Sequence, residues 1–243
     1  MSELSNYIDE YLKTEYTLKN TLKDSVQSSV YLYQKNDSAK QIVKISQKNR
    51  NDHVLQRLRG QLNKNTATIY EVCSNDEDVT VLEEYISGAT LRHIVEANGG
   101  TLKRELAVKY ALDICNGLVF IHSLGIIHRD IKPSNIIITE QGEAVIIDFG
   151  IARLTDDSKY SDTKNLGTAG YAAPEQFGIY QSGPVTDIYA VGVLLNELLL
   201  GVHPTIDTPK GKLGKVINKC IMAQMSKRYQ NVSALAEVLN KLL

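Results

Sequence analysis

Residues 128–150 read HRDIKPSNIIITEQGEAVIIDFG, and this stretch decides the fold. Its two apolar runs, IIIT and AVIID, bracket a polar turn at residues 141–143, a pattern that predicts a β-hairpin. The hairpin would bring Asp148 near Asn135, so that a carboxylate and an amide share one cation. Oxygen ligands of this kind suit magnesium, which prefers one or two carboxylates together with phosphate oxygens. Asp130 lies in the loop before the first strand, where it is free to face a substrate.

The order of these residues resembles the catalytic core of protein kinases, in which HRDxKxxN is followed by DFG. The resemblance implies that Asp130 orients the attacking hydroxyl and accepts its proton, while Lys132 offsets charge on the transferring phosphoryl group. It also implies that Asn135 and Asp148 hold magnesium beside ATP. The alternative is a polar loop that merely caps a hairpin. It does not explain the lysine two residues after the acid, nor the second acid at the end of an apolar strand.

The composition is that of an ordinary globular protein, with 43% hydrophobic and 23% charged residues in a chain of 243. The 27 basic and 28 acidic residues leave a net charge of −1, so no global field favours nucleic acid or a membrane surface. Three scattered cysteines, at 73, 115 and 220, indicate buried thiols in a reducing, cytoplasmic compartment. We expect no signal peptide, because the N-terminus lacks an apolar core, and no membrane span, because acids interrupt the apolar window 185–201.

The resemblance covers the chain from about Tyr16 to Leu243 and implies a two-lobed α+β fold. Residues 1–86 are expected to form a small β-rich lobe, and residues 87–243 a larger, mainly helical lobe that carries the catalytic and activation loops. Hydrophobic periodicity predicts helices over 3–13, 51–62, 102–124 and 232–243, a buried apolar helix over 185–201, and five strands within 16–46 and 67–86.

The small lobe departs from the family pattern in two places. The loop that covers the phosphates should read Gly-x-Gly-x-x-Gly-x-Val, but residues 23–30 keep only Val30 and lack all three glycines. Serines in this loop cannot relax the backbone as glycine does. The helix over 51–62 should carry a glutamate to pair with the strand lysine, but no glutamate occurs between residues 16 and 70. Both departures weaken the expectation of tight nucleotide binding.

Lys44 interrupts an apolar strand and matches the lysine that reaches the α- and β-phosphates; an edge-strand lysine facing solvent is the alternative. Ile42 replaces a usual alanine and would narrow the adenine slot. Glu83 falls at the back of the nucleotide pocket, where a lone buried carboxylate is costly. We therefore predict that Glu83 replaces the missing helix glutamate as the partner of Lys44. The alternative is a one-residue register slip that turns Glu83 outward and Glu84 inward.

Residues 84–86 resemble the start of the hinge, whose backbone groups would meet adenine. The full set that the resemblance assigns to the nucleotide is Val30, Ile42, Lys44, Glu83, Glu84, Ile86 and Ile137.

Residues 151–175 are polar, irregular and long for a connector, and they resemble an activation segment that ends in Ala-Pro-Glu. Thr168 matches the threonine that hydrogen-bonds Asp130 and Lys132, and together with Lys132 it favours serine or threonine over tyrosine targets. Arg129 is placed to bind a phosphate on this segment, which implies autophosphorylation within 155–168. The candidate phosphosites are Thr155, Ser158, Tyr160, Ser161 and Thr163. The alternative, that they are merely solvated loop hydroxyls, holds for most of them.

Three further residues are assigned structural roles. The resemblance implies that Asp187 supports the catalytic loop from below and that Arg228 pairs with Glu175. His122, at the end of a predicted helix, is expected to pack or to cap that helix.

The sequence thus predicts a serine/threonine protein kinase that uses ATP and magnesium and acts on a protein hydroxyl, with Asp130, Lys132, Asn135 and Thr168 as its catalytic residues. One rival is a pseudokinase that serves as a nucleotide-binding or scaffold module, favoured by the missing glycines and glutamate. Another is a small-molecule phosphotransferase of related fold, which the peptide-kinase features Lys132, Thr168 and Ala-Pro-Glu disfavour.

Overall fold

The computed structural model describes residues 3–26, 28–48, 51–75, 77–156, 168–177 and 181–243. The chain divides into two compact units, the first made of residues 1–63 and 67–86 and the second of residues 64–66 and 87–243. The short segment 64–66 joins the second unit because Thr66 forms a bridge with Ile146 and the Asn65 amide donates to the Ala144 carbonyl at 2.9 Å.

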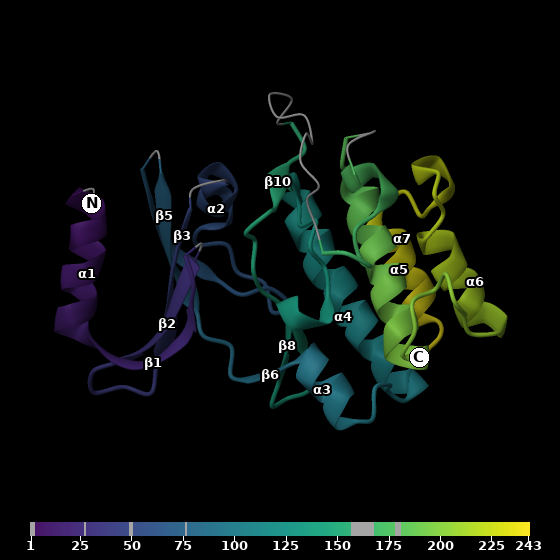
Figure 1. The fold of residues 1–243 in the computed structure, drawn as a ribbon, viewed down its shortest axis with the longest axis horizontal. Coiled ribbons are helices and arrows are strands. Elements are labelled where there is room, and N and C mark those ends of the chain that lie inside the picture. The colour runs from purple at the N-terminus through teal and green to yellow at the C-terminus, as the bar shows by residue number, and fades with distance from the viewer. Residues whose placement is uncertain (1–2, 27, 49–50, 76, 157–167, 178–180) are drawn as a thin grey trace. The chain divides into compact units, whose positions relative to one another are not determined.

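The first unit contains a five-stranded antiparallel sheet, as predicted, in the order β1-β2-β3-β5-β4 (Figure 1). Its strands are β1 (Tyr16–Asp24), β2 (Ser28–Lys35), β3 (Gln41–Lys48), β4 (Ile69–Ser74) and β5 (Asp78–Glu84). Strand β3 lies at the centre, and its register against β5 pairs Val43 with Glu83 and Lys44 with Leu82. Since directly opposed residues share a face, this register decides which side chains each face of the sheet presents.

Two helices cover opposite faces of this sheet (Figure 1). Helix α1 (Glu3–Glu15) packs on the face that carries Cys73, whereas helix α2 (Asp52–Leu58) lies on the face that carries Ser74. A hydrogen bond of 3.0 Å from the Ser74 hydroxyl to the Asp52 carboxylate holds α2 on that face. Consecutive strand residues point to opposite faces, so the two helices are separated by the sheet.

Helix α2 is shorter than the predicted helix over 51–62. It ends at Leu58, and the chain then turns through Gly60, whose φ is +73° and whose N–H donates to the Ile69 carbonyl at 2.8 Å. Leu62, expected on the apolar face of the helix, is 77% exposed. The early glycine breaks the helix before the last residue of the apolar pattern.

The second unit is mainly helical, as predicted. Its long central helix α4 (Arg104–Ser123) packs against α5 (Pro184–Leu200) and α7 (Val232–Asn240), and α5 also packs against α6 (Gly211–Cys220). Helices α3 (Leu91–Ala97) and α6 were not among the predicted helices. Across the part of the chain that the structure describes, every helix is too short or too polar to span a bilayer.

The hairpin predicted over residues 136–147 is confirmed. Strands β8 (Ile136–Thr139) and β9 (Ala144–Ile146) pair antiparallel, and Gly142 supplies the left-handed turn residue at φ +74°. Strand β6 (Gly88–Thr90) adds a third strand alongside β8. A two-stranded ladder joins β7 (Ile126–Ile127) to β10 (Arg153–Leu154). The segment 128–152 therefore begins and ends at neighbouring positions.

Candidate active site

The centre of the candidate site is the carboxylate of Asp130, which accepts three side-chain hydrogen bonds. Its Oδ1 accepts from the Thr168 hydroxyl at 2.8 Å. Its Oδ2 accepts from the Lys132 ammonium at 2.7 Å and from the Asn135 amide at 2.9 Å. The Lys132 ammonium also donates to the Thr168 hydroxyl at 2.7 Å, so both hydrogen bonds predicted for Thr168 are present.

The loop backbone is held as well, because the Asn135 amide also donates to the Asp130 backbone carbonyl at 3.0 Å. Asn135 is 5% exposed, and it ends the short 3-10 turn Pro133–Asn135 that leads into β8. Residues 130 to 135 are thus tied to one another and to Thr168, which lies more than thirty residues later in the chain.

The loop before Asp130 rests on a buried carboxylate, that of Asp187 on α5. Asp187 is 0% exposed and accepts from the backbone N–H of His128 at 2.9 Å and from that of Arg129 at 2.8 Å. Arg129 has φ +67°, a conformation that costs an ordinary residue about 1–3 kcal/mol and persists only where its surroundings impose it. The predicted supporting role of Asp187 is confirmed by these two bonds.

His122 completes this support, since its Nε2 lies 2.8 Å from Asp187 Oδ2. Sequence reasoning assigned His122 only a packing or capping role and missed this contact. Burial by itself would raise the pKa of Asp187, but the hydrogen bond from His122 and the charges of His122 and His128 outweigh burial and lower that pKa below its usual value. The carboxylate is therefore held in its ionised form, as the best acceptor for two backbone N–H groups.

Asn135 and Asp148 flank the open end of the β8–β9 hairpin. The Ile147 N–H donates to the Asn135 carbonyl at 2.9 Å, which places Asp148 one residue beyond this pair. Because the Asn135 nitrogen donates to Asp130, its amide oxygen is the atom suited to coordinate a cation. Asp148 is exposed, adopts φ +66°, and accepts from the Gly150 N–H at 3.0 Å. One amide oxygen and one exposed carboxylate fit magnesium, which keeps several waters and takes few protein ligands.

Phe149 is buried directly after this acid. Its ring is 3% exposed and packs against the His128 ring, with centroids 5.3 Å apart. This contact fixes the residue next to Asp148 to the loop that carries Asp130.

The segment after Gly150 is fixed at both described ends. At its start, Arg129 donates from Nε to the Ile151 carbonyl at 2.8 Å. At its end, Arg228 forms the predicted pair with Glu175 through two parallel hydrogen bonds of 2.6 and 2.8 Å, both side chains being almost fully buried. The candidate phosphosites Ser158, Tyr160, Ser161 and Thr163 lie outside the described residues.

Gln176 links the end of this segment to the catalytic loop, a role that sequence reasoning missed. Its amide donates to the Arg129 carbonyl at 2.9 Å and its carbonyl accepts from the Ala173 N–H at 3.0 Å. The side chain is 2% exposed, and a glutamine next to the Ala-Pro-Glu motif gives no periodic signal of such a role.

The predicted ion pair between Lys44 and Glu83 is wrong. The register of β3 against β5 places Lys44 opposite Leu82 and Glu83 opposite Val43, so the two side chains leave opposite faces of the sheet. The Lys44 ammonium instead lies 2.5 Å from the carboxylate of Asp9 on α1. Glu84 rather than Glu83 shares the face of Lys44, but Glu83 is only 7% exposed, so the alternative in which Glu83 turns outward does not describe the structure either.

The remaining residues assigned to the nucleotide are distributed over both units. Ile42 is 2% exposed and packs beneath α1, and the Glu84 carboxylate accepts from the Thr68 N–H at 3.2 Å. Val30 pairs with Ile45 and lies on the other face, with Glu83. Ile86 ends the first unit, and Ile137 lies in β8 of the second, opposite Val145.

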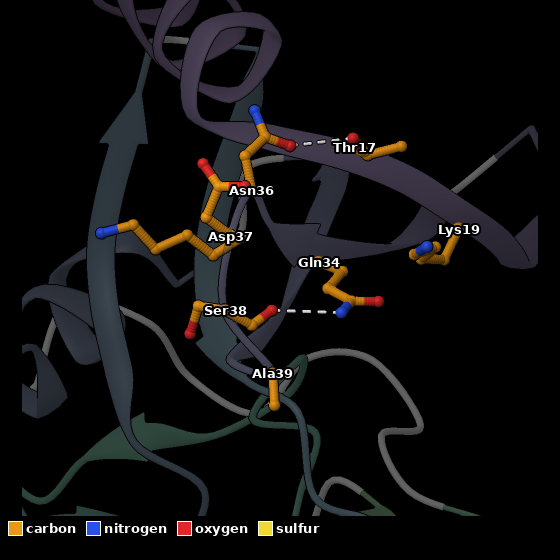
Figure 2. Close-up of a pocket in the computed structure, with 8 residues that line it drawn as sticks. Thr17, Lys19, Gln34, Asn36, Asp37, Ser38 and Ala39 are labelled. Atoms are coloured by element: carbon orange, nitrogen blue, oxygen red, sulfur yellow. Dashed lines mark hydrogen bonds between the residues drawn. The ribbon is translucent and has the colours of Figure 1, made fainter.

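A surface pocket in the first unit contains none of these residues. It has a volume of about 700 Å³ and lies where β1 and β2 meet the turn before β3 (Figure 2). Hydrogen bonds from the Thr17 hydroxyl to Asn36 and from the Gln34 amide to the Ser38 carbonyl shape it, at 2.9 and 3.1 Å. Its lining is polar, and no predicted catalytic or metal-binding residue reaches it.

Comparisons with known proteins identify relatives of this chain. A probable serine/threonine-protein kinase of Clostridium acetobutylicum is 33% identical over 205 residues, which are 73% of this chain and 31% of that protein. A probable serine/threonine-protein kinase of Clostridium perfringens is 36% identical over 143 residues, 58% of this chain and 21% of the relative. The serine/threonine-protein kinase PknB of Mycolicibacterium smegmatis is 41% identical over 133 residues, 53% and 21% of the two chains.

This chain therefore spans less than a third of the length of these relatives. The model of the protein kinase domain, in contrast, matches residues 11–243. With its five-stranded sheet, its helical second unit and its catalytic-loop geometry, the chain belongs to the protein kinase family, and its relatives are serine/threonine protein kinases.

Proposed function

We propose that this chain is an active serine/threonine protein kinase, which transfers the γ-phosphoryl group of ATP to a hydroxyl of a protein substrate. The single observation that carries the proposal is the network around Asp130, in which Lys132, Asn135 and Thr168 all donate to one carboxylate. A hairpin-capping loop has no need of three convergent side-chain donors on a partly exposed acid. A site that must orient an incoming hydroxyl does need them.

The chain's own residues act mainly by positioning and by electrostatics. The Asp130 carboxylate orients the substrate hydroxyl and accepts its proton, and its hydrogen bonds to Thr168 and Lys132 fix the direction in which it points. The Lys132 ammonium places a positive charge beside the oxygens on which negative charge accumulates. Little covalent chemistry is required of the protein in phosphoryl transfer, so this arrangement supplies much of what the reaction needs.

Asn135 and Asp148 would hold magnesium through an amide oxygen and a carboxylate. When bound, magnesium supplies neutralisation of phosphate charge. The hydrogen bond between Ile147 and Asn135 keeps the two ligands at the same end of the hairpin, and the one from Asn135 to Asp130 ties the metal-binding residue to the proposed base.

The proposal is tested by incubating purified protein with labelled ATP, magnesium and a generic basic protein substrate. We expect label on serine or threonine of the substrate, and mass spectrometry of the chain itself tests autophosphorylation within residues 155–168. Asp130→Asn should abolish transfer. Glu140→Gln, an exposed acid in the hairpin turn, is the matched control and should leave transfer unchanged.

The rival function is that of a pseudokinase, which binds nucleotide or a partner without transferring phosphate. Two observations favour it: the loop over residues 23–30 lacks all three glycines, and the Lys44 ammonium is paired with Asp9. Mg·ATP binding without transfer to the substrate or to the chain itself would establish this rival and refute the proposed enzyme.

A further inference from the structure

Lys44 lies on the face of the sheet that α1 covers. Its direct neighbours across the strands are Tyr31 on β2 and Leu82 on β5, and Leu82 packs in one cluster with Ile8 and Leu12 of α1. The residues beside it in β3 point to the other face, which α2 covers. A lysine on this strand thus faces an N-terminal helix rather than the helix that follows the strand.

This face is filled by α1. Ile8 and Leu12 are 2% and 1% exposed, and they lie on Ile42, Cys73 and Leu82, which are themselves at most 8% exposed. The helix also continues into β1 without a connecting loop, since α1 ends at Glu15 and β1 begins at Tyr16. Removing α1 would expose a contiguous apolar surface at the centre of the sheet, so α1 is an integral layer of this unit.

The Asp9–Lys44 pair is the polar contact inside this layer. The two charged atoms are 2.5 Å apart, and the side chains are 33% and 13% exposed. Asp9 follows Ile8 and precedes Leu12 by three residues, so it borders the apolar face of the helix. Val30 and Glu83, two of the residues assigned to the nucleotide, lie on the other face of the sheet, so the Lys44 ammonium does not share a face with them.

We propose that Lys44 is an anchoring residue, whose ammonium fastens α1 to the sheet through Asp9 and takes no part in holding the nucleotide. Ile42 belongs to the same interface, because its side chain packs in one cluster with Ile8 and Leu12 of α1. This inference rests on the proposed function in one respect. If the chain transfers a phosphoryl group, Lys132 and magnesium offset the phosphate charge, and no residue of β3 contributes.

A double-mutant cycle with Asp9→Asn, Lys44→Met and the combined variant tests the anchor. Urea unfolding measures the unfolding equilibrium constant of each protein, and we expect the two changes to be coupled by roughly three- to tenfold, the range for a pair in contact that is partly exposed. The matched control is the cycle of Lys48→Met with Asp78→Asn. That pair also joins β3 to β5, with the charged atoms 2.9 Å apart, but both side chains are more than half exposed. Each of these two changes should therefore alter the effect of the other on the unfolding equilibrium constant by a factor close to one.

Calorimetric titration of the same proteins with Mg·ATP tests the second part of the proposal, that Lys44 takes no part in holding the nucleotide. We expect the dissociation constant of Lys44→Met to stay within threefold of the wild-type value. A larger loss of affinity overturns the inference, as does an Asp9–Lys44 cycle with no more coupling than the Lys48–Asp78 control. If the wild-type chain binds no Mg·ATP at all, the proposed function fails, and the unfolding cycle then decides the anchor by itself.

Discussion

Replacing Asp187 by asparagine should destabilise the second unit severely although the side chain keeps its shape. The carboxylate accepts from two backbone N–H groups and from His122, at 2.8–2.9 Å and with no exposure to solvent. An amide presents one oxygen and one NH2 group. Whichever way it is turned, at least one backbone N–H of His128 or Arg129 meets a donor instead of an acceptor.

The magnitude follows from the bonds affected. Hydrogen bonds to a charged group contribute about 1.5–3 kcal/mol each, so losing or weakening two of the three costs about 3–6 kcal/mol. For a chain of this size that corresponds to a decrease in melting temperature on the order of 10 °C. Because the bond to Asp187 helps to hold Arg129 in its left-handed conformation beside Asp130, phosphoryl transfer should fall as well.

The pH dependence separates this cause from ordinary packing damage. The folded pKa of Asp187 is lowered, so its contribution is fully present above the unfolded value of about 3.9 and is lost as pH falls through the lower folded pKa. Urea unfolding followed by circular dichroism should give a stability difference between wild type and Asp187→Asn that shrinks as the pH falls below about 4. A variant within 1 kcal/mol of wild type at pH 7, or a difference that does not shrink in acid, would refute the reasoning.

Three further variants test other contacts. Thr168→Ala removes both of its hydrogen bonds and should lower kcat about 10- to 100-fold with little change in the KM for ATP, whereas Thr168→Ser should retain most activity in the same steady-state assay. Arg228→Met leaves the buried Glu175 carboxylate without its two-bond partner and should cost about 3–5 kcal/mol in urea unfolding; a loss below 1 kcal/mol would contradict this. Gly88→Ala places a methyl group 2.1 Å from the Ile138 carbonyl oxygen, and thermal melting should show a large decrease, which an unchanged melting temperature would disprove.

The second unit was predicted well because its signals are local. The hairpin, the helix at residues 104–123 and the apolar helix at 184–200 follow from periodicity and turn residues within a few positions of each other. The contacts of Thr168, Asp187 and Glu175 join distant parts of the chain, and they were reached through the family resemblance. The catalytic role of Thr168 remains a prediction.

The partner of Lys44 could not be read from the sequence because it depends on which face of β3 meets which helix. In QIVKISQK both faces carry large apolar residues, Ile42 on one and Val43 and Ile45 on the other, so alternation does not tell them apart. The face is decided by pairing with strands far away in the chain. Asp9 had a weak signal, an acid bordering the apolar stripe of a helix, which sequence alone reads as an ordinary solvated position.

The most direct test of the proposed catalytic centre is a calorimetric titration of ATP into wild type and Asp148→Asn, with and without magnesium. If Asn135 and Asp148 hold the metal, wild type should bind ATP at millimolar concentration far more tightly with magnesium than without it, and Asp148→Asn should lose most of that dependence. A wild-type chain that binds no Mg·ATP at millimolar concentration, or an Asp148→Asn variant with undiminished magnesium dependence, would contradict the account.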